Sequence, residues 1–216
     1  KDLDLLFFKL LYDLNINFLI ECGANEASAS MRAKEIGVNA LGIEANPYTF
    51  EKITPKSCKK FSKLNFGLGD ENGSMIFYIP KSNHTAANAT FKPKQNVNYN
   101  TRKVEVKRLD DLIENTDYIN SPFALWIDVE GMQKEVLNGA IKTLQNYNCR
   151  IIKIEVEDQP LFGDQKWLTQ DIINSLNKLG YEIVFRDFEY ESQNNLLLIN
   201  KNFSTTVKEK YLDIFY

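Results

Sequence analysis

Short apolar segments typical of β-strands alternate with helix-like segments along most of the chain, and this alternation constrains the fold more than any other feature. Residues 17–22 and 40–45 predict the first two strands. The run 123–129 (FALWIDV) is almost continuously apolar, as expected of a parallel strand buried on both faces. Residues 181–185 and 195–199 predict a closing hairpin. We therefore expect an α/β fold with a doubly wound, mostly parallel sheet, helices on both faces and one antiparallel strand.

The other predicted elements are less regular. Residues 73–79 and 103–107 predict two more strands. Residues 80–103 are polar and show no periodicity, so we expect a long loop there, of the kind that is usually functional or disordered. The remaining predictions are strands at 61–68 and 151–156, and helices at 26–36, 47–59, 132–145 and 167–179.

The length of 216 residues fits one domain with short attachments. We expect an N-terminal helix within residues 1–16, a single domain over residues 17–200 and a C-terminal tail over residues 201–216. No run of about 18 apolar residues occurs, so no membrane span is expected. Because the sequence begins at Lys1, we expect a trimmed or excised piece whose targeting information can be missing.

Charge and cysteine content exclude several classes of protein. The formal net charge is −3, whereas general nucleic-acid binders usually carry a basic excess, so no nucleic-acid partner is expected. The three cysteines are far apart and only one histidine is present, which argues against a zinc site. Sparse, odd-numbered cysteines fit a reducing compartment and predict a cytoplasmic location. The oligomeric state stays open.

A glycine turn follows the first predicted strand, at residues 20–27 (IECGANEA). Gly23 permits a tight turn where ligands bind in open α/β sheets. The dinucleotide motif GxGxxG has a second glycine that admits a pyrophosphate, and this sequence lacks it. The loop therefore suits a nucleoside ligand without a pyrophosphate, such as S-adenosylmethionine (SAM). The alternative is an ordinary strand–turn–helix connection.

Two acids follow the next strands. Glu44 stands about 20 residues past the glycine turn, where a carboxylate can accept hydrogen bonds from two ribose hydroxyls. Asp70 could accept from an adenine amino group, with Phe66 or Leu68 flanking the ring. The alternatives are a solvated strand-end acid at Glu44 and a plain glycine turn at residues 65–70.

The segment 126–131 (WIDVEG) places two carboxylates, Asp128 and Glu130, at the end of a deeply apolar strand. Burying acids costs several kcal/mol unless they are paired or used, so we favour a functional role. The structural alternative is that Glu130 caps the following helix.

Six motifs occur here in one order: ECGAN, GIEANP, NFGLGD followed by GSMIFY, RLDDL, IDVEG and IIKIEVE. This series resembles the FkbM family of methyltransferases over residues 17–158. The resemblance implies a class I methyltransferase fold with a seven-stranded sheet and SAM-dependent O-methylation of a sugar, glycan or related small molecule. It implies cofactor contacts from residues in the first three motifs and places Asp128 and Glu130 toward the transferred methyl group. The predicted cofactor-binding residues are Glu21, Gly23, Ala24, Asn25, Glu44, Ala45, Asn46, Gly67 and Asp70.

The sequence departs from the family pattern at three positions. Glu21 replaces a more usual aspartate, Ala27 a glycine and Trp126 a lysine. The plain interpretation of Trp126 is a core residue, and the functional one is an aromatic wall of the acceptor site.

An alcohol is a poor nucleophile, so a hydroxyl acceptor needs a base. Asp128 or Glu130 is the hypothesis for that base, and His84 is the rival. A divalent ion held by Asp128, Glu130 and Glu155 is a further option, since oxygen ligands suit magnesium or calcium.

The segment between residues 72 and 104 contains basic residues and no acid. If it covers the acceptor site, its positive field would attract an anionic acceptor. The alternative is a solvated lysine-rich loop. The basic residues are Lys81, Lys92, Lys94, Arg102 and Lys103.

Three other functions remain possible from the sequence. An NAD-dependent oxidoreductase would need the missing second glycine. A nucleic-acid methyltransferase would often carry an Asn/Asp-Pro-Pro-aromatic motif where residues 128–131 (DVEG) stand. A nucleoside-binding protein that has lost catalysis would keep the same fold.

Overall fold

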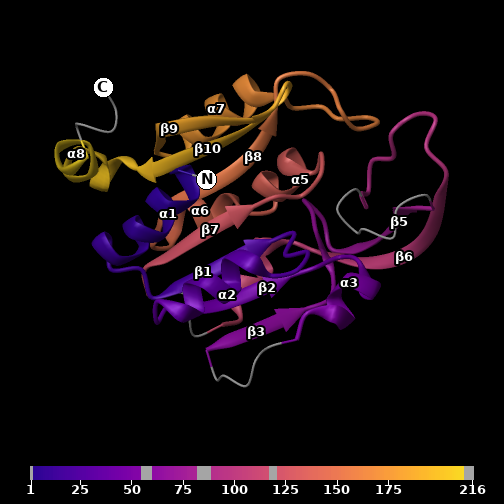
Figure 1. The fold of residues 1–216 in the computed structure, drawn as a ribbon, viewed down its shortest axis with the longest axis horizontal. Helices are drawn as coiled ribbons and strands as arrows, with labels where there is room; N and C mark the ends of the chain where they lie inside the picture. Colours follow the sequence, from indigo (N-terminus) through magenta and orange to yellow (C-terminus); the bar gives the residue numbers. More distant parts are fainter. Residues whose placement is uncertain (1, 55–59, 82–88, 117–120, 212–216) are drawn as a thin grey trace.

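The computed structural model describes residues 2–54, 60–81, 89–116 and 121–211. Its main element is a seven-stranded sheet in the order β3-β2-β1-β7-β8-β10-β9 (Figure 1). β10 runs antiparallel to both neighbours, and the other pairs are parallel, so the predicted doubly wound, mostly parallel seven-stranded sheet is confirmed. The strands are β1 Phe18–Cys22, β2 Asn39–Ile43, β3 Phe61–Leu64, β7 Phe123–Ile127, β8 Cys149–Glu157, β9 Tyr181–Tyr190 and β10 Gln193–Asn200.

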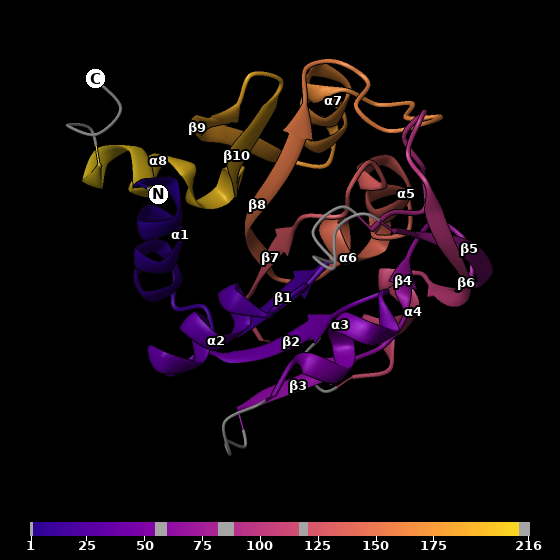
Figure 2. The ribbon, with the colours of Figure 1, turned by 45° about the vertical axis from the view of Figure 1, so that its right-hand side comes forward.

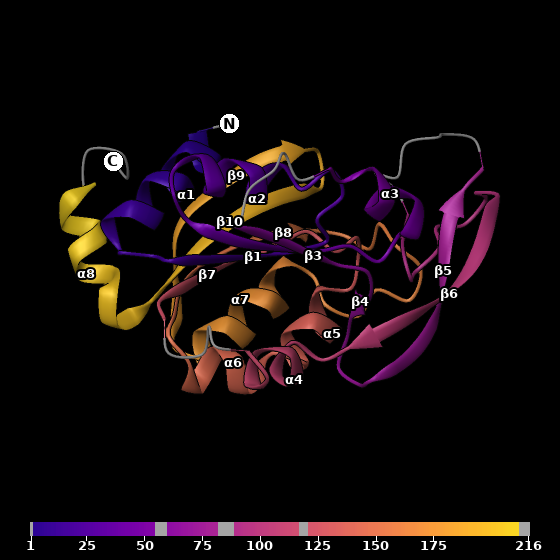
Figure 3. The same cartoon turned by 90° about the horizontal axis from the view of Figure 1, so that it is seen from below.

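Helices cover both faces of this sheet, as Figures 2 and 3 show. Successive side chains of a strand point to opposite faces, and β1 accordingly sends Leu19 into one core and Ile20 into the other. One core lies under α1, α2 and α8, and the other under α4 to α7. In the described part of the chain, no helix is long and apolar enough to cross a membrane. The helices are α1 Asp2–Asp13, α2 Ser28–Glu35, α3 Pro47–Lys52, α4 Leu109–Glu114, α5 Gln133–Asn138, α6 Ile141–Asn146, α7 Thr169–Lys178 and α8 Lys201–Lys210.

The two ends of the described chain lie side by side (Figure 1). The predicted tail contains α8, whose Lys210 Nζ is 2.5 Å from Oδ1 of Asp13 on α1. Tyr211 also donates a hydrogen bond to Asp13, and Val207 is buried in the core that lies under α1, α2 and α8.

A second, three-stranded sheet stands beyond the carboxyl ends of the parallel strands (Figure 1). It consists of β4 Gly67–Leu68, β6 Tyr99–Lys107 and β5 Gly73–Pro80, in that order.

The predicted single strand 61–68 is therefore wrong, because the chain leaves the main sheet at Asn65. The Asn65 amide donates to the Glu44 carbonyl at 2.8 Å there. The predicted loop 80–103 is also too long. β6 begins at Tyr99, and its first half is mostly exposed on both faces, which leaves no apolar periodicity in the sequence.

The predicted helix 132–145 is two helices, α5 and α6, because the chain breaks at Gly139. A Cβ at Gly139 would lie 2.0 Å from the Gly69 carbonyl oxygen, so the turn after β4 packs against this break. The buried Asp110 carboxylate then accepts the Thr143 N–H at 2.7 Å at the start of α6 and pairs with Arg108 at 2.9 Å. The RLDDL motif thus stabilises a helix terminus.

Candidate active site

A cavity of about 460 Å³ lies at the carboxyl ends of β1, β2, β7 and β8, within the size range of small-molecule sites. β1 is flanked by β2 on one side and β7 on the other, so the order in which the strands are added to the sheet reverses there, which is where open α/β sheets bind ligands. The second sheet, residues 89–94 and the β9–β10 hairpin complete the walls.

At the floor of the cavity, the backbone at Gly23 lies in close contact with the backbone at Asp128. The φ of Gly23 is +81°, and a Cβ there would lie 1.7 Å from the Asp128 carbonyl oxygen. The Gly23 and Ala24 N–H groups both donate to the Ile43 carbonyl, at 3.0 and 2.9 Å. Asn25 follows with a φ of +47° and lines the cavity. The glycine turn therefore joins the ends of β1, β2 and β7.

Glu21 lies below this turn and does not line the cavity. Its buried carboxylate accepts the N–H groups of Ala29 at 3.1 Å and Ser30 at 2.8 Å, at the start of α2. Burial raises the pKa of Glu21 to about 7, although these hydrogen bonds oppose the shift. Glu21 thus anchors the helix that follows the turn.

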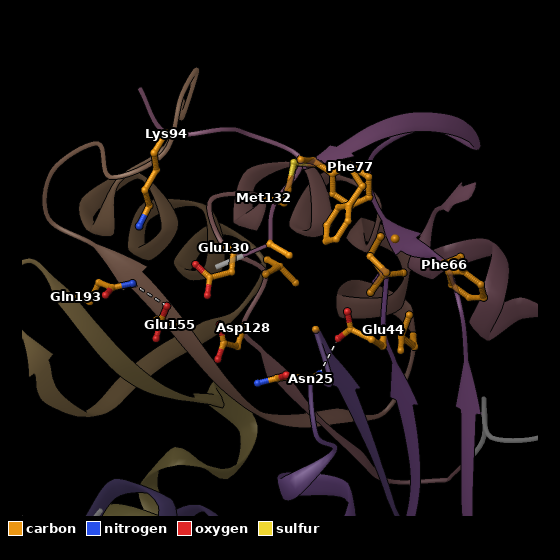
Figure 4. A pocket seen from close by; sticks show the side chains of 18 of the residues that line it. Asn25, Glu44, Phe66, Phe77, Lys94, Asp128, Glu130, Met132, Glu155 and Gln193 are labelled. Carbon is orange, nitrogen blue, oxygen red and sulfur yellow. Dashed lines mark hydrogen bonds between the residues drawn. The ribbon is translucent and has the colours of Figure 1, made fainter. Parts of the chain in front are cut away.

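Glu44 lines the cavity and is 7% exposed. One of its oxygens accepts the N–H of Asn25 at 2.6 Å (Figure 4). The other accepts the N–H of Asn46 at 2.7 Å, and the two bonds fix the orientation of the carboxylate. Asn46 is outside the cavity and caps α3 by accepting the Tyr48 N–H, while Ala45 is in the lining. Each carboxylate oxygen has a second lone pair, so Glu44 can also accept from ribose hydroxyls.

An apolar, mostly aromatic wall stands beside Glu44. Phe66, Leu68, Phe77 and Phe91 line the cavity, and the Phe77 and Phe91 ring centres are 4.7 Å apart. Gly67 makes room for this wall, since a Cβ there would lie 2.5 Å from the Phe91 ring. An apolar wall of this kind suits a flat heterocyclic base.

Asp70 is exposed and is not part of the lining. Phe66 and Leu68, the two residues expected to flank an adenine ring, do line the cavity. Trp126 is outside the cavity too. It packs edge-on against Phe7 of α1, with ring centres 5.3 Å apart, as expected of a core residue.

The predicted acids Asp128, Glu130 and Glu155 all line the cavity, so the end of β8 meets the end of β7 there. Burial raises all three pKa values. Lys153 opposes the rise at Asp128, and the neighbouring carboxylates add to the rise at Glu155. The pKa of Glu130 reaches about 8, because of burial and then the charge of Asp128. Because Lys153 opposes the rise only at Asp128, the pKa of Asp128 is the lowest of the three.

Glu130 stands in an unusual backbone conformation, with a φ of +47°. Its carbonyl accepts the Thr90 hydroxyl at 2.7 Å, and the next residue, Gly131, lies so close to Phe162 that a Cβ would clash. Non-glycine residues in this region are strained and concentrate at functional sites. The Glu130 side chain does not cap α5, which begins without a side-chain cap.

Among the residues that the structure describes, no three His, Cys, Asp or Glu side chains are grouped to hold a metal ion. The proposed ligand set of Asp128, Glu130 and Glu155 shares one cavity without forming such a group. His84 falls outside the described residues.

Four lining residues have no distinct signal in the local sequence: Lys94, Glu189, Tyr190 and Gln193. The Gln193 amide donates to Glu155 at 3.1 Å and so joins the hairpin to β8. Lys94 is one of the basic residues of the segment 80–103, but nothing in the sequence separates it from its neighbours.

Figure 4 shows two ends of the cavity. Glu44, Phe66 and Phe77 form one end. Glu155, Gln193 and Lys94 lie at the opposite end. Asp128 and Glu130 lie between them.

Comparison with solved structures identifies the fold. Magnesium protoporphyrin IX methyltransferase from Synechocystis PCC 6803, solved with bound SAM, superposes with a TM-score of 0.54 at 7% identity, covering 92% of this chain and 78% of that one. Fibrillarin from Aeropyrum pernix, in complex with SAM, gives 0.52 at 7% identity, covering 85% of this chain and 66% of that one. At such identities the similarity concerns the fold, which is that of class I SAM-dependent methyltransferases.

Sequence comparison is more specific. The hexuronic acid methyltransferase AglP of Haloferax volcanii is 29% identical over 148 residues. The match covers 65% of this chain and 58% of that protein, so this chain spans somewhat more than half the length of the curated relative. The Methyltransferase FkbM domain matches residues 21–183, which is most of the chain. The chain therefore belongs to the FkbM methyltransferase family.

Proposed function

We propose that this chain is a SAM-dependent methyltransferase that methylates a hydroxyl group of a sugar or glycan. The observation that carries this proposal is the two-ended cavity, whose ends meet at Asp128. The end at Glu44, Phe66 and Phe77 suits the nucleoside of SAM, and we call it the nucleoside end. The end at Glu155, Gln193 and Lys94 suits a sugar, and we call it the acceptor end. SAM, when bound, supplies the methyl group on a positively charged sulfonium. The chain has to bind both substrates, align them and remove a proton from the acceptor.

The nucleoside end has the chemistry to hold SAM. Glu44 would accept the ribose hydroxyls, and Phe66 with Leu68 would flank the adenine. Backbone contacts would come from Gly23, Asn25, Ala45 and Gly67. Glu21, Ala24 and Asn46 would act indirectly, by holding the loops in place. Asp70, being exposed, would need a movement of its loop to reach a ligand.

Asp128 is the candidate base. It lies between the two ends, and its carboxyl is the one that ionises most readily, so it can take the hydroxyl proton near neutral pH. Glu130, whose pKa is about 8, is mostly protonated at neutral pH and suits hydrogen-bond donation to an acceptor oxygen. His84 stays a rival prediction for the base.

A sugar acceptor is supported by the relative from Haloferax volcanii, which acts on hexuronic acid. Carboxylate and amide side chains, as found at the acceptor end, are suitable partners for several hydroxyl groups at once. The cytoplasmic location and the absence of a nucleic-acid partner stay predictions.

The test is methyl transfer from labelled SAM to a panel of uronosides, neutral glycosides and sugar phosphates. We expect a product methylated on oxygen, with kcat falling about 10²–10⁴-fold in Asp128→Asn and less in Glu130→Gln. S-adenosylhomocysteine should bind both variants as it binds the wild type. Full turnover by Asp128→Asn would disprove the assignment of the base, and cofactor binding without turnover on any acceptor would favour the inactive binding protein.

A further inference from the structure

Lys94 is the one cationic side chain in the described lining of the cavity. It is half-buried, and its ammonium lies 4.5 Å from the centre of the Phe162 ring. Within the described ranges, no carboxylate lies at ion-pair distance from it. A lysine that is partly desolvated without an ion pair is available to bind an anion.

The other basic residues of the same segment are engaged or remote. Lys92 is buried and its ammonium is 2.9 Å from Oε1 of Glu135. Arg102 donates to the Tyr48 hydroxyl and lies over its ring. Lys81 and Lys103 are exposed and lie outside the lining. The positive field expected from five basic residues is thus reduced, inside the cavity, to the single charge of Lys94.

Acidic and amide groups surround the rest of the acceptor end. Glu155 and Glu189 line it, Glu130 stands beside it, and Gln193 donates to Glu155. Figure 4 shows the Lys94 side chain extending toward Glu130 and Gln193. A second negative charge on a ligand would face the Asp128 and Glu189 carboxylates, whereas hydroxyl groups could donate to the oxygens of all these side chains.

Tyr190 adds an aromatic surface at the mouth of the cavity. It is a lining residue, yet it is 67% exposed. An exposed ring beside carboxylate and amide groups offers apolar contact to one face of a sugar ring, whose edge carries the hydroxyls.

We propose that the acceptor end selects a sugar bearing one anionic group, a carboxylate, which binds Lys94 while Glu155, Glu189 and Gln193 bind its hydroxyls. This inference rests on the proposed function and adds the charge of the acceptor and the residue that recognises it. A phosphate could supply the same kind of contact, but its second charge would be repelled by the Asp128 and Glu189 carboxylates. The segment 80–103 thus contributes one lysine to recognition, not a general basic surface.

The experiment measures binding of three probes, with and without S-adenosylhomocysteine: methyl glucuronoside, methyl glucoside and glucose 1-phosphate. We expect the uronoside to bind about tenfold more tightly than the neutral glucoside, with the sugar phosphate weaker than the uronoside. Lys94→Met should remove this preference, and Lys94→Arg should keep part of it. Lys103→Met, which removes an exposed lysine outside the cavity, should leave the preference unchanged.

Each other outcome overturns the proposal. Lys94 would be shown not to recognise a carboxylate by any of four results. These are equal binding of uronoside and glucoside, no binding of either sugar, tighter binding of the phosphate, or a preference that survives Lys94→Met. S-adenosylhomocysteine binding separates this failure from failure of the proposed function. It should be retained in Lys94→Met, and its absence from the wild type would count against the methyltransferase assignment instead.

Discussion

Trp126 and Lys153 lie opposite each other on the parallel strands β7 and β8, and the Lys153 ammonium is 3.6 Å from the centre of the Trp126 ring. The same ammonium is 3.2 Å from Oδ1 of Asp4 on α1. Burial raises the pKa of Asp128, and Lys153 opposes that rise. A buried cation on the α1 side of the sheet therefore helps to keep the candidate base ionised.

We expect Lys153→Met to raise the pKa of Asp128, because the opposing positive charge is lost. The base works when deprotonated, so the acidic limb of kcat/KM against pH should move to higher pH, by about one unit. Activity should fall more at pH 6 than at pH 8.5. A pH–rate profile checks this, with Lys153→Arg restoring the wild-type limb.

Lys166→Met is the matched control, since Lys166 is exposed and lies outside the cavity. An unchanged acidic limb in Lys153→Met would mean that Lys153 serves packing against Trp126 alone.

Glu155 should make stability depend on pH. Burial and neighbouring carboxylates raise its folded-state pKa, so the folded chain holds a proton that the unfolded chain releases. The contribution of protonated Glu155 to the free energy of unfolding is complete below its pKa in the unfolded chain, about 4.3. It is lost as pH rises toward the pKa in the folded chain. Glu155→Gln mimics the protonated acid and keeps an oxygen to accept from Gln193.

The variant should therefore raise Tm over the wild type at pH 8.5 and differ little at pH 5, as measured by thermal unfolding across pH. Glu51→Gln, at an exposed position, should show no such trend. A Tm difference that is constant with pH, or larger in acid, would contradict the assigned cause.

Gly23→Ala should destabilise the fold, because the new Cβ would lie 1.7 Å from the Asp128 carbonyl oxygen at a residue whose φ is +81°. We expect a loss of about 2 kcal/mol or more, or about 4–8 °C in Tm, together with weaker cofactor binding. Gly73→Ala is the control, since its Cβ would meet nothing within 4 Å. Equal Tm values for the two variants would show that the turn can relax.

The local sequence was sufficient to predict an element of secondary structure where burial leaves a periodic or continuous apolar pattern. β7 was predictable because Phe123, Leu125 and Ile127 are buried among other apolar residues. The first half of β6 was not, since its side chains are exposed. The break between α5 and α6 was also not predictable, because it depends on Gly139 packing against Gly69, 70 residues earlier.

The same distinction holds within the site. Glu44, Asp128 and Glu130 follow strands, and parallel strands bring their carboxyl ends to one edge. Lys94 reaches the cavity from the segment that connects β5 to β6, and Tyr190 and Gln193 reach it from the β9–β10 hairpin. Their positions follow from tertiary packing, and no motif marks them.

Thermal unfolding with ligands tests the central claim most directly. SAM and S-adenosylhomocysteine, at about 100 times their dissociation constants, should stabilise the wild type by roughly 2.7 kcal/mol, or about 5–10 °C, while NAD should not. Glu44→Gln should reduce the shift, and Glu51→Gln should leave it unchanged. A shift with NAD, or no shift with either sulfur nucleoside, would contradict the account of the nucleoside end.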